Sequence, residues 1–92
     1  MFTVIAFDIV DDRIRYRVVK ALRRYAVRVQ KSVFESAALS ATDFQRLREE
    51  IEELIDPKVD AVRYYLLCGS CIPRIELSGC GRVTRHLAYV VL

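Results

Sequence analysis

The sequence of 92 residues lacks the features that mark membrane, secreted and repetitive proteins. No apolar run approaches the roughly 20 residues that a membrane-spanning helix needs. The first residues lack the pattern of a secretory signal peptide, because Asp8 interrupts the apolar run early. No internal repeat and no long linker divides the chain. We therefore expect a single cytoplasmic domain over residues 1–92 that does not contact a membrane.

The sequence also has little net charge, only +3, which excludes a polybasic tail. Its 15 cationic residues are unevenly divided, however, because only Lys20, Lys31 and Lys58 are lysines. The planar donors of arginine suit phosphate and carboxylate better than the point charge of lysine. This bias favours a partner that carries phosphate, although a solvated arginine-rich surface remains the alternative.

Apolar periodicity predicts the order of secondary structure. Residues 2–9 are β-branched, aromatic and nearly continuously apolar, as in a central strand. A helix over 12–25 follows, with Asp11 or Asp12 as its cap and with an apolar stripe formed by Ile14, Val18, Ala21, Leu22 and Tyr25.

The second half of the chain repeats this alternation. Residues 27–39 have the composition of two short strands, or of one strand with a bulge. Thr42 and Gln45 form a candidate capping box for a helix that ends at Asp56 and Pro57. A further strand is expected over residues 61–67, and the tail offers one or two more, over residues 72–79 and 85–92.

This order predicts an α+β fold of the ferredoxin-like sandwich type, in which two helices pack on one face of an antiparallel sheet. The final strand exceeds what one such domain needs. The apolar run LAYVVL would invite aggregation if it formed an uncovered edge. We therefore expect a homodimer in which a strand near residues 86–91 pairs with the sheet of the other subunit.

Asp8 is the first candidate functional residue, because it ends an apolar strand just before a basic helix. A carboxylate is a hard oxygen ligand that suits Mg²⁺ or Mn²⁺. The alternative is that Asp8 only ends the strand and accepts backbone donors in the turn.

The first helix also carries a basic row. Arg13, Arg17, Lys20 and Arg24 recur at helical spacing opposite the apolar stripe. Such a row predicts binding to double-stranded nucleic acid with little base specificity, or else a solvated face.

The cysteines and the single histidine allow three interpretations. Cys68, Cys71, Cys80 and His86 follow the spacing C-x2-C-x8-C-x5-H, which suits a tetrahedral zinc site. A redox-active CxxC pair is the second interpretation, and three ordinary thiols are the third.

Three stretches, FDIVDDRIRYRVVKAL, RVQKSVFES and VRYYLL, together resemble the CRISPR-associated protein 2 family over about residues 2–67. That family supplies the small partner of the integrase that acquires CRISPR spacers in antiviral defence. The resemblance implies a ferredoxin-like homodimer in which two copies of Asp8 face each other and bind Mg²⁺ or Mn²⁺ as a catalytic metal site. The family commonly has tyrosine where this chain has Phe7.

The resemblance also places residues near the acidic site. Arg15, Arg17, Arg28 and Phe34 match family positions there, with Ser32 as a further polar contact. The arginines would bind nucleic acid, whereas Ser32 and Phe34 would contact substrate or the dimer interface. A core position for Phe34 is the alternative.

Two functional hypotheses follow from the resemblance. The first is a metal-dependent endonuclease, a hydrolase acting on phosphodiesters of single-stranded RNA or of DNA. The second is a non-catalytic scaffold that binds double-stranded DNA within the integrase complex. An unrelated RNA-recognition domain is disfavoured, because its aromatic strand motifs are absent from the sequence.

Overall fold

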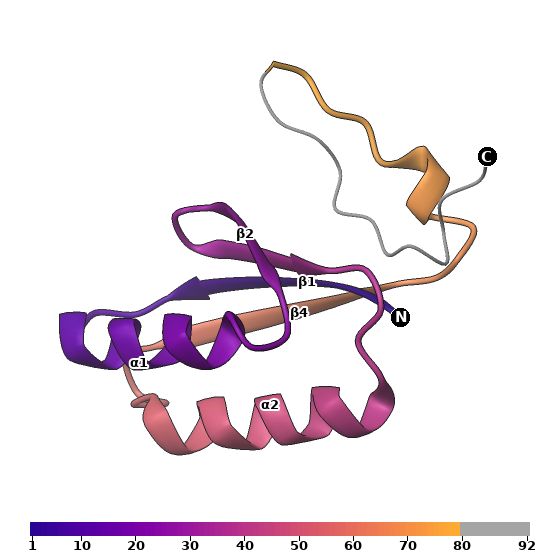
Figure 1. The fold of residues 1–92 in the computed structure, drawn as a ribbon. Helices are drawn as coiled ribbons and strands as arrows, with labels where there is room; N and C mark the ends of the chain where they lie inside the picture. The colour runs from indigo at the N-terminus through magenta and orange to yellow at the C-terminus, as the bar shows by residue number, and fades with distance from the viewer. Residues whose placement is uncertain (80–92) are drawn as a thin grey trace.

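The computed structural model describes residues 1–79, which form two helices against one antiparallel sheet (Figure 1). The elements in chain order are β1 (Phe2–Asp8), α1 (Asp12–Leu22), β2 (Val27–Gln30), β3 (Val33–Ser36), α2 (Ala41–Leu54), β4 (Ala61–Leu67) and the short 3₁₀ helix η1 (Ile72–Arg74). The strand order is β2-β3-β1-β4. Both helices lie on the same side of the sheet in Figure 1. The predicted ferredoxin-like α+β fold is therefore confirmed.

The core fills the space between the helices and one face of the sheet. Successive strand residues point to opposite faces, so Ile5 and Phe7 of β1 share the helix-facing side. They pack with Phe34 of β3 and with the buried residues of the two helices, which include Val18, Leu22, Leu47 and Ile51. Val4, Ala6 and Asp8 lie on the opposite side, which we call the open face because neither helix covers it.

Within residues 1–79 neither helix is long and apolar enough to cross a membrane.

The structure corrects the predicted start of α2. Its N-cap is Ser40 rather than Thr42, because the Ser40 hydroxyl accepts the amide of Asp43 at 3.1 Å. Gln45 instead donates to Glu49 one turn further on. The cap of α1 is confirmed as Asp11, whose carboxylate accepts the amides of Arg13 and Ile14.

The strand predicted over residues 72–79 is wrong. Residues 72–74 form η1, and residues 75–78 form neither helix nor strand. Pro73 accounts for part of the difference, since it has no amide hydrogen to donate to a neighbouring strand and its fixed φ suits a tight turn. Residues 85–92, including the strand predicted near 86–91, lie outside the described residues.

One core side chain leaves a polar group without a partner. The Tyr64 ring packs edge-on against Phe44, with 5.4 Å between ring centroids. Its hydroxyl is buried and has no hydrogen-bond partner within the described part of the chain. Burial, followed by the charge of Glu52, raises the pKa of Tyr64 to about 12.

We expect Tyr64→Phe to raise the free energy of unfolding by about 1 kcal/mol, because it removes a desolvated hydroxyl and keeps the ring contact. Urea denaturation measures the change. Tyr65→Phe is the matched control, since Tyr65 is 47% exposed and its hydroxyl should contribute little. A loss of stability in Tyr64→Phe would show that the hydroxyl has a partner.

Candidate acidic site and basic helix groove

Asp8 is exposed on the open face, at the last position of β1. Register places it opposite Ala61 of β4 and diagonally from Arg63, which is also exposed and lies on the same face. Arg63 was missed by the sequence analysis. The alternation of Ala61, Arg63 and Tyr65 along β4 was the signal that could have assigned it to this face.

The β2–β3 hairpin flanks the end of β1. The Phe7 amide donates to the carbonyl of Ser32 at 3.0 Å, so the hairpin turn lies beside the strand end that carries Asp8. Within the turn, the Arg28 guanidinium donates to the carbonyl of Lys31, with 3.1 Å from Nε to the oxygen. The structure therefore brings Ser32 and Arg28 to the same end of the sheet as Asp8, and their contacts with nucleic acid or substrate, which the family resemblance implies, stay predictions.

The aromatic residues near this end belong to the core. Phe34 is fully buried, 6.2 Å from Phe7 between ring centroids, and the Arg28 guanidinium covers its ring at 5.8 Å. The core alternative for Phe34 therefore holds. Phe7 is also buried and points away from the open face. A tyrosine hydroxyl at position 7 would accordingly begin on the side of the sheet opposite Asp8.

Arg15 stabilises the turn between β1 and α1. Its Nη2 donates to the carbonyl of Ile9 at 2.7 Å, and its guanidinium forms an ion pair with Asp12. These donors are directed at acceptors of the protein itself. Arg15 therefore positions the segment that follows Asp8, and its predicted contact with nucleic acid stays a prediction.

Asp60 is a second residue that the sequence analysis missed. Its buried carboxylate accepts the amide of Val10 at 3.0 Å and the amide of Asp56 at 2.9 Å. One side chain thus joins the segment after β1 to the turn between α2 and β4. Nothing in the local sequence distinguishes it from the three other carboxylates of residues 52–56, because its partner Val10 is 50 positions away.

We expect Asp60→Ala to lower the free energy of unfolding by about 2–3 kcal/mol, since it leaves two amides without their acceptor. Asp60→Asn keeps one acceptor oxygen and should lose less. Chemical denaturation measures both variants. Equal stability of Asp60→Ala and the wild type would remove this carboxylate from the set of residues that hold the strand end.

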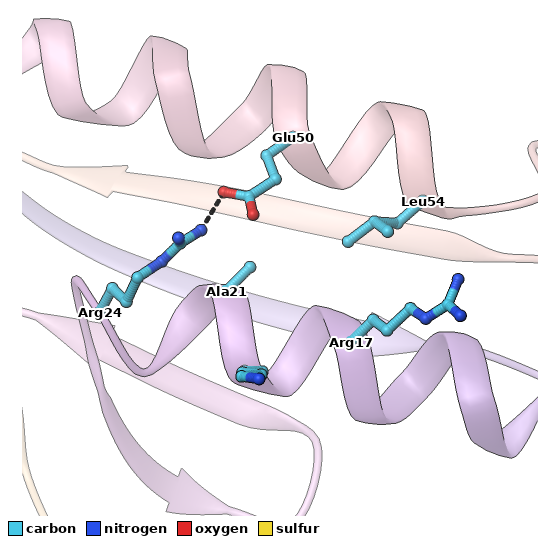
Figure 2. Close-up of a pocket in the computed structure, with 6 residues that line it drawn as sticks. Arg17, Ala21, Arg24, Glu50 and Leu54 are labelled. Carbon is cyan, nitrogen blue, oxygen red and sulfur yellow. Dashed lines mark hydrogen bonds and ion pairs between the residues drawn. The ribbon is translucent and has the colours of Figure 1, made fainter.

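A groove of about 340 Å³ lies between α1 and α2 and carries most of the predicted basic row. Figure 2 shows Arg24, which follows the end of α1 at Leu22, paired with Glu50 of α2, with Ala21 and Leu54 nearby and Arg17 also lining the groove. Lys20 completes the lining. Within residues 1–79 no ion pair engages Arg17 or Lys20. Arg13 is exposed on the first turn of α1.

Only half of the predicted zinc ligands lie in the described residues. Cys68 and Cys71 are exposed after the end of β4, and their sulfur atoms are 3.2 Å apart. Cys80 and His86 lie outside the described range. Within residues 1–79 no group of three or more acidic, cysteine or histidine side chains is arranged to hold a metal.

The predicted Mg²⁺ or Mn²⁺ site at Asp8 stays a prediction. Within residues 1–79 the exposed carboxylate of Asp8 belongs to no group of three or more acidic, cysteine or histidine side chains that could hold a metal. A carboxylate has the oxygen chemistry that these cations prefer. This donor fits a metal site to which a second subunit contributes another carboxylate across the open face.

Fold and site together define a small ferredoxin-like protein with a strand-end aspartate on its open face and a basic groove between its helices. The chain belongs to the CRISPR-associated protein Cas2 family, whose model matches residues 1–75. It is 46% identical over 84 residues to CRISPR-associated endoribonuclease Cas2 3 of Chloroflexus aurantiacus, covering 91% of this chain and 89% of the relative.

Solved structures show the same fold. Streptococcus pyogenes Cas2 matches with a TM-score of 0.74 and 28% identity, over 86% of this chain and all of that one. A chain from a partial Cas6-RT-Cas1–Cas2 complex matches with a TM-score of 0.75 over 99% of this chain and 98% of its own length. Its identity of 24% supports the fold alone.

Proposed function

We propose that the protein acts in CRISPR spacer acquisition as a homodimer that cleaves RNA or DNA phosphodiesters with Mg²⁺ or Mn²⁺. The observation that carries this proposal is the exposed carboxylate of Asp8 on a sheet face that neither helix covers. The family supplies the biological context, and several relatives are named endoribonucleases.

The open face supports the homodimer. Register assigns Val4 and Ala6 of β1, Tyr65 of β4 and Val27 of β2 to this face. Val27 is 56% exposed and Tyr65 is 47% exposed. Apolar surface of this kind is typical of a protein–protein contact. If two open faces pack about a twofold axis, each subunit contributes its Asp8 to the shared interface.

Asp8 and the side chains near it would have different roles in cleavage. The two Asp8 carboxylates would hold the cation, which supplies charge neutralisation and a lowered pKa for bound water. Arg63, on the same face, would offset the charge that builds up on the phosphate during attack. Arg15 and Asp60 would act by holding the segment after β1, so that the carboxylates keep their orientation.

The alternative function is a scaffold that binds double-stranded DNA and does not cleave it. A specific observation favours it, because the groove cations Arg17 and Lys20 lie on the helix side of the sheet, opposite Asp8. DNA binding can then proceed without the acidic site. The partner in this case is the integrase subunit, by analogy with the complex that contains both Cas1 and Cas2.

A nuclease assay on the purified protein tests the proposal. Single-stranded RNA and double-stranded DNA are incubated with Mg²⁺, with Mn²⁺ or with a chelator, and light scattering at micromolar concentration measures the oligomeric state. The endonuclease predicts cleavage that requires metal in a dimer. A dimer that binds DNA and cleaves neither substrate with any divalent metal would support the scaffold, and a monomer would contradict both functions.

A further inference from the structure

Two cysteines form a closed turn directly after β4. Cys68 follows the last residue of that strand, and Cys71 precedes η1. The Cys71 amide donates to the carbonyl of Cys68 at 3.0 Å, which closes the turn around Gly69 and Ser70. Figure 1 shows this segment leaving the end of the sheet on the way to η1. Both thiols are exposed, so a small reagent can reach them.

The turn brings the two sulfur atoms almost to bonding distance. They are 3.2 Å apart, and a disulfide bond requires about 2.05 Å. The sulfurs therefore need to approach by only about 1 Å, a change within reach of side-chain rotation in a surface turn. The backbone hydrogen bond has already brought the two residues together, so oxidation does not require the turn to refold.

The surroundings of the two thiols are unequal. The Ser70 hydroxyl lies 3.0 Å from the Cys68 sulfur, and the Cys71 thiol contacts the same sulfur. Donation by these groups stabilises a Cys68 thiolate, which lowers the pKa of Cys68 to about 7. The pKa of Cys71 is raised, because its proton is donated to Cys68 and the Cys68 charge opposes a second thiolate. The Ser70 hydroxyl and the Cys71 thiol both contact the Cys68 sulfur, and this arrangement assigns Cys68 as the attacking thiol and Cys71 as the resolving thiol.

We propose that Cys68 and Cys71 form a thiol–disulfide exchange site that accepts low-molecular-weight disulfides. The Cys68 thiolate attacks one sulfur of the disulfide, forms a mixed disulfide and releases one small thiolate, which takes up a proton from water. Cys71 gives its proton to solvent, and its thiolate attacks the Cys68 sulfur; the second small thiolate leaves and takes up a proton from water. The two protein thiols are oxidised to one disulfide, and the small disulfide is reduced to two thiols.

Within residues 1–79 Cys68 and Cys71 belong to no group of three or more acidic, cysteine or histidine side chains that could hold a metal. The other two residues of the predicted zinc spacing, Cys80 and His86, lie outside the described residues. The exchange site is also separate from the proposed nuclease site. Phe2, at the start of β1, pairs with Leu67 at the end of β4, whereas Asp8 lies at the other end of β1. The two proposals can therefore fail independently.

The test uses the full chain with Cys80→Ser, which leaves only the two cysteines of the turn. Treatment with glutathione disulfide near pH 7 should convert this protein to an internal disulfide, detected by intact mass as a loss of about 2 Da that dithiothreitol reverses. In Cys71→Ser/Cys80→Ser the resolving thiol is absent, so a glutathione adduct at position 68 should accumulate. A persistent adduct in the protein that retains both thiols, or no reaction, would overturn the proposal.

A second experiment measures the difference in reactivity between Cys68 and Cys71. With limiting iodoacetamide near pH 7, peptide mass analysis of the Cys80→Ser protein should find Cys68 alkylated faster than Cys71, because the Ser70 hydroxyl and the Cys71 thiol can both donate to the Cys68 sulfur. Ser70→Ala removes the nearest donor and should reduce this ratio. Cys71→Ser and Ser70→Ala should keep the thermal midpoint of the Cys80→Ser parent, because Cys71 and Ser70 are exposed. Equal alkylation of the two thiols would contradict the assignment of Cys68 as the attacking group.

Discussion

Asp8→Asn is expected to abolish metal-dependent cleavage while leaving nucleic-acid binding intact. The substitution keeps the size of the side chain, and in the proposed dimer it would replace a charged oxygen ligand by a neutral one in each subunit. Loss of the proposed cation would remove several kcal/mol of transition-state stabilisation, which corresponds to a rate reduced about a hundredfold or more. Binding should survive, because no cationic side chain is changed. Cleavage of single-stranded RNA and of double-stranded DNA in Mg²⁺ or Mn²⁺ is the measurement.

Asp12→Asn is the matched control for this experiment. Asp12 lies four residues further along the chain, forms an ion pair with Arg15, and its side chain is 90% exposed. The hydrogen bond from Arg15 to the carbonyl of Ile9 does not involve Asp12, so the turn after β1 should be kept. The same change of charge there should leave the rate close to that of the wild type. A metal-dependent activity that Asp8→Asn retains at full rate would exclude the open-face carboxylate as its source.

Reversal of the groove charges should weaken DNA binding for all sequences alike. Arg17→Glu/Lys20→Glu removes two cations per subunit from the groove and adds two negative charges. We expect affinity for short duplexes of unrelated sequence to fall by at least about tenfold at moderate salt, with a shallower salt dependence because fewer counterions are released. Fluorescence anisotropy over a range of salt concentrations measures both effects.

The control for the groove carries the same net charge. Arg46→Glu/Lys58→Glu changes two exposed cations that do not line the groove. If both double variants lose the same affinity, net charge alone explains binding and the groove has no special part in it. If neither variant loses affinity, the basic row of α1 is a solvated face.

Sequence periodicity was enough to predict the fold of the described residues. The apolar stripe of α1 and the nearly continuous apolar run of β1 each had to be buried on one side. Two helices packed on one face of a sheet bury both of these apolar surfaces. Asp8 was also predicted to be a strand-end carboxylate, and the structure shows it exposed at the last position of β1. Its place on the open face depends on register, which the strand pattern alone left open.

The remaining details depended on contacts between distant residues. Asp60 holds Val10 from across the fold, and Arg63 shares a face with Asp8 only through the pairing of β1 with β4. Ser40 rather than Thr42 caps α2, because Leu39 before it is buried and donates its amide to the carbonyl of Met1. These contacts of Leu39 fix the residue at which α2 can begin. Such constraints have no local signature in the sequence.

The strand order also determines how long β1 waits for its neighbouring strands while the chain is being synthesised. β1 leaves the ribosome first, yet Ala6 pairs with Val33 and Phe2 pairs with Leu67, so its two neighbours are made long after it. Pairing between such distant segments slows folding and leaves apolar strand residues open to aggregation in the interval. α1 is the next element to be synthesised, and its apolar stripe packs in the same core as Ile5 and Phe7. The first helix is therefore the earliest cover that the central strand can receive.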